Sequence, residues 1–341
     1  MANKDLVKNT ELQKKKHISY AKYGYIFSIP FVAAWLLFMA YPIFYTLFIG
    51  FTNLKGLGST NFSITNPWYK NFVTTLNTPS FRVALSNTFK MWIINFIPQL
   101  GLALVLAAWF TNEQNNIKGK GFFKVVFYMP NIITASTIAI LFASLFGYPK
   151  SPVNDILMAI GAIDVPYNFP QSKTAAQLLV AFIQFWTWFG YTMIVLSSGI
   201  LGISPDIFEA AEIDGANGVQ QFFKITLPNL KTIMLFTLVT SLIGGLQMFD
   251  IPFMLMQNSG PDNATLTASV FIYNQAFKGS YMYNRAASAS MIMFVIISII
   301  SAGMFFIMRD KDEAQQYKLE KARIKAYKKQ LKEAKMAEKQ A

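Results

Sequence analysis

Eight residues in the apolar part of the chain carry groups that can bind or admit a polar ligand. They combine two aromatic rings, an amide, a carboxylate and two hydroxyls with a pair of glycines: Trp188, Tyr191, Gly244, Gly245, Gln247, Asp250, Ser288 and Ser290. Rings stack on the C–H faces of a polyhydroxylated molecule, and the polar groups exchange hydrogen bonds with its hydroxyls. Taken singly, each residue is explained at least as well by an interfacial aromatic belt or by the packed core of a helix bundle.

These eight residues fall within long apolar runs that predict membrane-spanning helices. The chain is 53% hydrophobic and only 14% charged, whereas a soluble domain averages about 25% charged residues. A span needs about 20 apolar helical residues, and six runs meet this length: 26–49, 84–109, 122–146, 175–201, 232–256 and 286–308. Segments of about ten alternating residues, typical of a membrane β-barrel, are not found. The sequence therefore predicts an all-α integral membrane protein with six transmembrane helices.

Asp250 is the only acidic residue clearly inside a predicted span. Burying an aspartate at the centre of a span costs about 2.5–3.5 kcal/mol on insertion scales, which favours a functional role. Gln247 precedes it by three residues and lies on a similar helical face. The alternative is a structural role, in which Asp250 caps a buried network and pairs with Arg285 or Lys278.

Residue counts exclude most catalytic chemistry. The chain has no cysteine, and its one histidine, His17, lies in a charged N-terminal stretch. Thiolate nucleophiles, thiolate and histidine metal clusters and Ser-His-Asp triads are therefore excluded. The sequence also lacks the G-x-x-x-x-G-K-[ST] phosphate-binding loop, since Gly119-Lys120-Gly121 has none of its other residues. An intramembrane enzyme is disfavoured, and we expect no metal or cofactor.

A polar loop over 202–231 separates the fourth and fifth runs. Ser204-Pro205-Asp206 predicts a helix start with a hydroxyl cap, and this helix is expected to reach about Ile213. Gly215 and Gly218 then break it, and a second short helix is expected to end before Pro228. Two short helices around a glycine elbow can fill a groove on a partner protein. The alternative, a solvated loop, remains open on spacing alone.

Positive charge is concentrated on one side of the predicted membrane. Six spans put four segments on one side of the membrane. These segments carry 22 of the 30 Lys and Arg residues: 1–25, 110–124, 202–231 and 309–341. Only 7 lie in the three segments on the other side: 50–83, 147–174 and 257–287. The positive-inside rule therefore places both termini and the polar loop in the cytoplasm. The net charge of +13 is thus a topology signal, and we expect no nucleic-acid partner.

The polar loop carries a recognisable pattern from Glu209 to Pro228. It reads E-A-A-x-x-x-G, then nine residues, then I-x-L-P. This pattern resembles the cytoplasmic signature loop of binding-protein-dependent ABC importer permeases. The resemblance implies that the loop docks on a separate ATPase, through Glu209, Ala210, Ala211, Asp214, Gly215, Ile225, Leu227 and Pro228.

Further landmarks extend the resemblance over roughly 26–308: Asn87-Thr88, Pro130, Trp188-Phe189-Gly190-Tyr191, Phe249-Asp250, Gly260-Pro261 and Thr265. They imply the type I ABC importer permease bundle and look closest to carbohydrate-uptake permeases of the maltose and glycerol-3-phosphate type, as the first of two permease subunits. Two departures leave the sugar open: the usual Gly-Gly-Pro reads Ser259-Gly260-Pro261, and the first outer loop is short.

The resemblance implies one half of a solute path in a bacterial cytoplasmic membrane. The residues expected beside an oligosaccharide are Trp188, Tyr191, Gly244, Gly245, Gln247, Asp250, Ser288 and Ser290. The implied partners are a second permease subunit, an ABC ATPase dimer that binds the ATP, an extracytoplasmic sugar-binding protein and membrane lipid. Glycerol phosphate, an amino acid or a peptide is the alternative solute. We expect a segment 1–25, a permease domain 26–308 and a basic tail 309–341, which lies either on anionic lipid or as a solvated helix.

Overall fold

The computed structural model describes residues 21–59, 62–112, 115, 117–256, 259–279, 281–308 and 319–327. These residues form helices and connecting loops, and their one β-type pairing is an isolated antiparallel bridge between Thr52 and Ile64. The predicted all-α class is therefore confirmed. The segment 1–20 and most of the predicted tail lie outside the described residues, although 319–327 is helical.

Five helical segments are long and apolar enough to cross a membrane: Lys22–Ile49, Pro79–Thr111, Lys173–Leu201, Lys231–Leu255 and Tyr283–Met308. The second, third and fifth are single helices, named α5, α9 and α16. A sixth candidate is a bent pair, α6 (Lys120–Ile132) and α7 (Ala135–Leu145), whose axes meet at 95°. The prediction of six spans is confirmed if this pair counts as one span.

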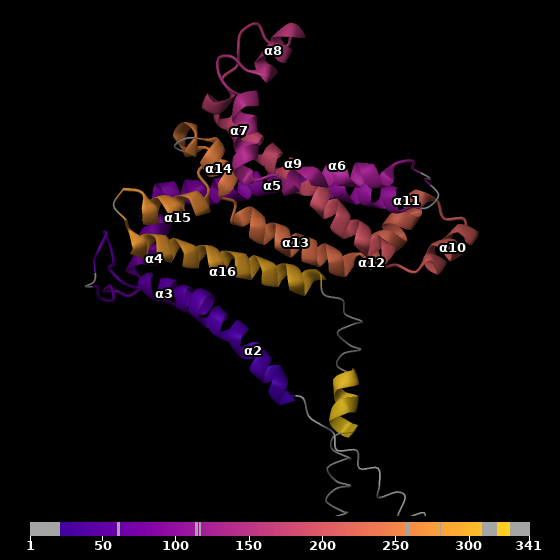
Figure 1. The fold of residues 1–341 in the computed structure, drawn as a ribbon, viewed down its shortest axis with the longest axis horizontal. Helices are drawn as coiled ribbons and strands as arrows, with labels where there is room; N and C mark the ends of the chain where they lie inside the picture. Colours follow the sequence, from indigo (N-terminus) through magenta and orange to yellow (C-terminus); the bar gives the residue numbers. More distant parts are fainter. Residues whose placement is uncertain are drawn as a thin grey trace, which may run out of the picture.

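The prediction of one continuous helix over 122–146 is wrong. Pro130 has no N–H to continue the helix, and Ile133 and Thr134 are both extended. The Thr134 side chain then accepts a hydrogen bond from the Thr137 N–H and so caps a new helix in a new direction. Figure 1 shows α7 rising away from α5, α6 and α9, with the short helix α8 (Pro152–Ala159) beyond it.

The fifth predicted span is also broken. It consists of α13 (Lys231–Leu246) and α14 (Asp250–Leu255), with the non-helical residues 247–249 between them. In an unbroken helix the Met248 carbonyl would accept a bond from residue 252, but Pro252 has no N–H to donate. The Thr267 hydroxyl donates to that carbonyl instead, at 2.9 Å. The break is therefore stabilised by a side chain from a distant loop.

The core lies where α9 packs between α5 and α6. Gly190 of α9 permits the closest approach, because a Cβ there would lie only 1.9 Å from the Phe127 carbonyl oxygen of α6. One buried cluster fills the space between α5, α9 and the start of α13: Ala103, Ala107, Phe110, Met193, Leu196, Ile200 and Leu230. A second joins α7 and α14 to α5 and α9 and contains Met91, Ile138, Phe142, Val180, Ile183, Met248 and Ile251.

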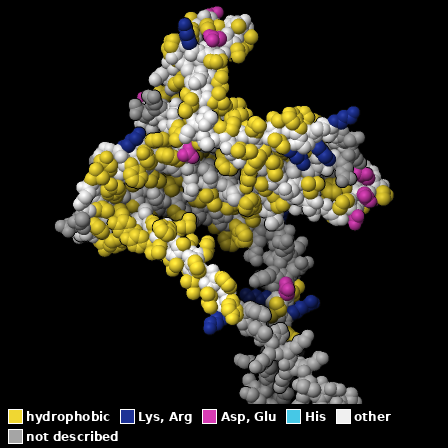
Figure 2. All heavy atoms as spheres, viewed as in Figure 1, with side chains coloured by type: hydrophobic (Ala, Val, Ile, Leu, Met, Phe, Trp, Pro, Cys, Tyr) yellow, Lys and Arg dark blue, Asp and Glu magenta, His cyan; other side chains and the backbone are white. Residues whose placement is uncertain are grey.

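The first span is nearly free of the rest of the bundle. It runs through α2 (Ala21–Trp35), a π-helical turn η1 (Leu36–Ala40) and α3 (Tyr41–Ile49). Only 6% of its most apolar window is buried, and Figure 2 shows hydrophobic side chains along its length. Contact with α16 is made at the end of α3, where Ile49 and Leu54 pack on Ala287. This leaves a long apolar surface for lipid or another subunit.

Short elements close the end of the bundle near α3. They are α4 (Lys70–Asn77), η3 (Phe169–Gln171), η6 (Pro261–Asn263) and α15 (Ala268–Phe277). Buried amides and hydroxyls bind them to the spans: Asn71 of α4 donates to the carbonyls of Gly50 and Thr52, and Asn87 of α5 donates to that of Asn263. Satisfied polar groups of this kind fix one arrangement of the loops.

Candidate functional site

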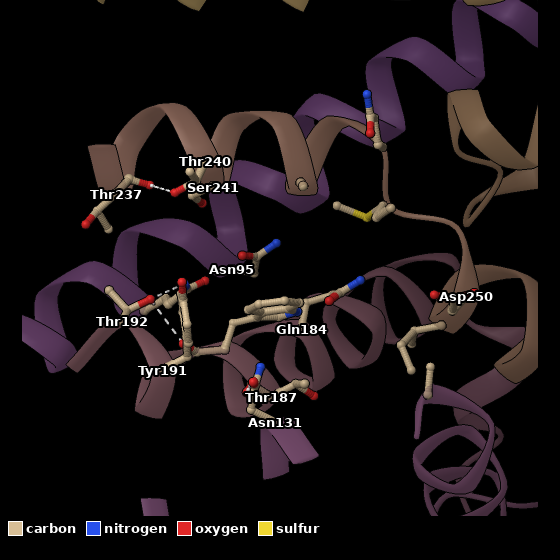
Figure 3. A pocket seen from close by; sticks show the side chains of 18 of the residues that line it. Asn95, Asn131, Gln184, Thr187, Tyr191, Thr192, Thr237, Thr240, Ser241 and Asp250 are labelled. Atoms are coloured by element: carbon tan, nitrogen blue, oxygen red, sulfur yellow. Dashed lines mark hydrogen bonds between the residues drawn. The ribbon is translucent and has the colours of Figure 1, made fainter. Parts of the chain in front are cut away.

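A cavity of about 540 Å³ lies between α5, α9, α13 and the start of α14. Figure 3 shows side chains from these helices converging on it. Its polar lining consists almost entirely of amides and hydroxyls: Asn95, Gln99, Asn131, Gln184, Thr187, Trp188, Tyr191, Thr192, Thr237, Thr240, Ser241, Gln247 and Asp250. Such a lining can hydrogen-bond a neutral polar ligand from several sides.

The amides of α5 are held in place by bonds to backbone and to α9. Gln99 donates to the Thr192 hydroxyl at 2.8 Å, and that hydroxyl donates to the Trp188 carbonyl at 3.1 Å. Asn95 donates to the Met91 carbonyl of its own helix at 3.1 Å. These bonds use amide N–H groups, so each amide also offers a carbonyl oxygen. The side chains are thereby fixed before a ligand arrives.

Trp188 and Tyr191 supply aromatic surface on α9. Their spacing of three residues puts them on one helical face, and their rings meet edge to face at 5.9 Å. They are 45% and 37% exposed. A ring with an open face can stack on the C–H surface of a sugar. Both aromatic residues that the sequence predicts for the site line the cavity.

The two glycines of α13 have different surroundings. A Cβ on Gly244 would meet nothing within 4 Å, because this position faces open space. A Cβ on Gly245 would lie 2.0 Å from Cδ1 of Trp92, so glycine is needed for α5 and α13 to pack. Trp92 in turn donates to the Ser241 hydroxyl at 3.4 Å. Gly244 thus keeps the cavity open, and Gly245 positions its wall.

Gln247 is the first residue of the break between α13 and α14, Asp250 directly follows the break, and both line the cavity. The structural alternative for Asp250 is not found, because among the described residues no ion pair joins it to Arg285 or Lys278, and Lys173 pairs with Asp262 at 2.6 Å. Lys278 instead lies over the Phe253 ring, 4.9 Å from its centroid. Asp250 is exposed in the isolated chain and begins α14 directly after the break.

The structure does not bring Ser288 and Ser290 to this cavity. Ser288 is fully buried, and its hydroxyl lies 2.8 Å from that of Thr75, which joins α16 to α4. Ser290 donates to the Ala286 carbonyl and lines a separate groove of about 620 Å³ between α13 and α16, together with Gln247. Figure 1 shows α13 lying between α9 and α16, and α13 packs against both. The prediction that these two serines lie beside Trp188 and Tyr191 is therefore wrong.

Several lining residues were missed by the sequence reasoning. The signal for them is the recurrence of polar residues at helical spacing: Gln184, Thr187 and Thr192 on α9, and Thr237, Thr240 and Ser241 on α13. These positions lie on the same faces as Tyr191 and Gly244. Asn131 carries no such signal; it lies in the last turn of α6 and donates to the Thr187 carbonyl of α9 at 3.4 Å.

The predicted docking loop is a separate site at the far end of the bundle. Its first helix, α10 (Pro205–Ile213), ends where predicted, and Gly215 makes the elbow with a φ of +79°. Ser204 makes no side-chain cap, contrary to the expectation. Instead Asn217 and Gln220 form a capping box that starts the second helix, each side chain accepting from the other's backbone N–H.

The second helix does not end before Pro228. It runs through α11 (Gly218–Gln221), a π-helical turn η4 (Phe222–Thr226) and α12 (Leu227–Asn229). In the π turn the Leu227 N–H bonds to the Phe222 carbonyl, and this wider register accommodates a proline at the next position. The predicted end is wrong for this reason.

The loop presents acidic and apolar side chains together. Figure 2 shows an acidic group at the end of the molecule, where α10 lies. Glu209, Ala210, Asp214, Gly215 and Pro228 are exposed, whereas Ala211, Ile225 and Leu227 are half-buried. Large apolar side chains accompany them, with Ile213 88% exposed and Phe223 61% exposed. Exposed apolar groups beside charges are typical of a surface that binds another protein.

Comparisons with known proteins cover almost the whole chain. The profile of the family described as binding-protein-dependent transport system inner membrane component matches residues 23–310. The lactose transport system permease protein LacF of Rhizobium radiobacter is 32% identical over 289 residues, which are 84% of this chain and 94% of LacF. The arabinooligosaccharides transport system permease protein AraP of Bacillus subtilis is 29% identical over 279 residues, 81% of this chain and 85% of AraP.

A solved structure shares the fold. It is the crystal structure of a bacterial ABC transporter involved in the import of the acidic polysaccharide alginate, with a TM-score of 0.72 at 22% identity, covering 86% of this chain and 97% of the other. A second structure, of the alginate transporter in complex with an alginate pentasaccharide-bound periplasmic protein, has the same TM-score at 23% identity, covering 87% and 97%. At these identities the likeness establishes the arrangement of the helices.

Proposed function

The chain belongs to the family of binding-protein-dependent transport system inner membrane components, and from this premise we propose that it forms one half of the path of an ATP-driven carbohydrate importer. The observation that carries the proposal is the cavity between α5, α9 and α13, where amides and hydroxyls surround an exposed pair of aromatic rings. The names of LacF and AraP, which refer to lactose and arabinooligosaccharides, support a sugar of more than one unit.

Hydrogen bonds in the cavity would replace those that the sugar leaves behind in water and on its carrier. Each contributes about 0.5–1.5 kcal/mol net, so a few bonds from Gln184, Gln247 or Thr240 give weak binding. Weak binding suits a path, because a tight site would trap the solute. We therefore propose Trp188, Tyr191, Gly244, Gln247 and Asp250 as path residues, with Gly245 shaping the wall. Ser288 and Ser290 remain sequence predictions outside the cavity.

The α10–α12 loop is proposed to bind an ABC ATPase that holds and hydrolyses the ATP. Its mixed acidic and apolar surface supports a protein partner, and the sequence itself has no phosphate-binding loop. A groove on the ATPase that accepts Ile213 and Phe223 beside basic side chains would match this surface. Movement of the loop would reach α13 directly, since only Leu230 separates α12 from the start of that helix.

A second permease subunit is proposed to complete the path. The cavity is not enclosed by this chain alone, and the exposed first span offers a long apolar surface to a neighbour or to lipid. We also propose an extracytoplasmic sugar-binding protein, which the relatives' family description and the alginate transporter's periplasmic protein support. The excess of Lys and Arg supports the proposal that both termini and α10–α12 lie on the cytoplasmic side of a bacterial cell membrane.

Reconstitution into liposomes tests this function. The chain would be purified with the second permease, ATPase and binding protein that accompany it in its native membrane, and uptake of labelled neutral oligosaccharides would be measured with and without ATP. We expect ATP-dependent uptake of at least one oligosaccharide. Uptake by this chain alone would contradict the subunit assignment, and uptake of glycerol phosphate, an amino acid or a peptide in place of any sugar would favour the alternative solute.

A further inference from the structure

One charged side chain lines the proposed path. Among the described residues around the cavity, Asp250 is the single ionisable acid or base apart from a tyrosine hydroxyl, and every other polar group there is a neutral amide, hydroxyl or indole. In Figure 3 it lies at one end of the cavity, with Gln184 between it and Tyr191. A ligand that extends along the cavity would therefore come close to a single negative charge.

Three lysines of the described residues have partners away from the cavity. Lys173 pairs with Asp262, and Lys278 lies over the Phe253 ring. Lys90 donates to Gln177 at 2.6 Å, within a network that also binds Asn87 and the Ala264 carbonyl. None of these three lysines lines the cavity. The negative field of Asp250 is therefore not cancelled by a cation of the described chain at the site.

The backbone holds Asp250 at this position. It is the first residue of α14, directly after the break, and Ile251 beside it is buried against α7 and α9. The bond from Thr267 to Met248 and the missing N–H of Pro252 keep the break in place. The backbone of Asp250 is thus held at one end of the cavity by packing on both sides of the break.

We propose that Asp250 makes this half of the path select neutral oligosaccharides and reject those that carry carboxylates, such as uronic acid oligomers. The inference rests on the proposed function. A carboxylate accepts hydrogen bonds from the hydroxyls of a neutral sugar, but repels a second carboxylate where water is partly excluded. Like charges brought together at a protein surface oppose binding strongly.

The proposed selection against acidic sugars is tested by measuring how trisaccharides bind to the transport complex. The binding protein is left out, so that its own specificity does not contribute. The assembled complex, without binding protein, would be titrated with a neutral arabinotriose and with a trigalacturonate of the same length. Wild type, Asp250→Asn and a control, Asp155→Asn, would be compared at low and high salt. Asp155 lies on α8, outside the cavity, so its variant removes the same charge from the same side of the bundle.

We expect the trigalacturonate to bind wild type about tenfold or more weakly than the neutral trisaccharide, since close like charges are repulsive. Asp250→Asn should remove most of this difference, Asp155→Asn should keep it, and high salt should narrow it in wild type. Equal binding of both trisaccharides to wild type, or an unchanged difference in Asp250→Asn, would overturn the selection and leave the carbohydrate path standing. Binding of neither trisaccharide to any variant would overturn the selection together with the proposed path.

Discussion

The hydroxyl of Thr267 donates a 2.9 Å hydrogen bond to the backbone carbonyl of Met248, across 19 residues of sequence. Both residues are buried, at 0% and 4% exposed. Without this bond the carbonyl at the end of the break would have no partner, because Pro252 cannot donate to it. The same hydroxyl accepts from the Val270 N–H and so caps α15. One side chain thus joins the wall of the cavity to the outer loops.

We expect Thr267→Val to destabilise the complex by about 1–3 kcal/mol, the cost of leaving a buried polar group without its partner. The measurement is the midpoint of thermal unfolding of the purified complex. Thr267→Ser keeps the hydroxyl and is expected to unfold near the wild-type temperature. A Thr267→Val complex as stable as the serine variant would show that the bond does not hold the break.

The adjacent glycines of α13 give a matched pair of variants. Gly245→Ala should place its methyl group 2.0 Å from Trp92 and force α5 and α13 apart, at a cost of about 1–3 kcal/mol for overpacking. Gly244→Ala meets nothing within 4 Å and should leave stability unchanged, or raise it slightly through helix propensity. Thermal unfolding of both variants checks this expectation. Equal loss of stability in the two would contradict the different roles assigned to them.

The docking loop is tested by one charge and one backbone change. Glu209→Lys reverses an exposed charge of α10, and Gly215→Leu puts a side chain at a φ of +79°, a left-handed conformation that costs about 1–2 kcal/mol for L-residues. We expect each to lower substrate-stimulated ATP hydrolysis by about tenfold, since an interfacial charge or elbow is disturbed.

The control for the elbow is Gly161→Leu, which imposes similar strain at a φ of +70° in the loop after α8. It should leave ATP hydrolysis near wild type, because it lies far from the proposed ATPase contact (Figure 1). Membrane insertion of all three variants would be checked by their yield. Full assembly and full stimulation in both loop variants would remove the coupling role.

Sequence patterns predicted the features that depend on local chemistry. Apolar runs longer than a bilayer predicted the spans, and Gly215 predicted an elbow because few other residues adopt its φ. The spacing of Trp188 and Tyr191 placed them on one face, as the structure has them. These signals are read within a few residues of each other, so they do not depend on the rest of the fold.

The features that were missed depend on partners far away in the sequence. The break after Leu246 needs Thr267, and the new direction of α7 depends on Thr134 as a cap rather than on Pro130 alone. Ser288 was predicted to lie at the depth of the path, but its hydroxyl bonds to Thr75 of α4 and does not line the cavity. Hydrophobicity along one helix predicts how deep a residue lies in the membrane. Tertiary packing decides toward which neighbouring helix its side chain points.

Span five provides the last test, because Gln247 lines the proposed path and Ser290 lines the groove on the other side of α13. Gln247→Ala should lower oligosaccharide uptake by about two- to tenfold, the value of one lost hydrogen bond, with normal assembly and ATPase binding. Ser290→Ala, whose hydroxyl bonds to its own helix, should keep the wild-type rate. Uptake of labelled oligosaccharides by the reconstituted complex measures both. If uptake falls in Ser290→Ala but not in Gln247→Ala, the path lies on the α16 side of α13 and not on its α9 side.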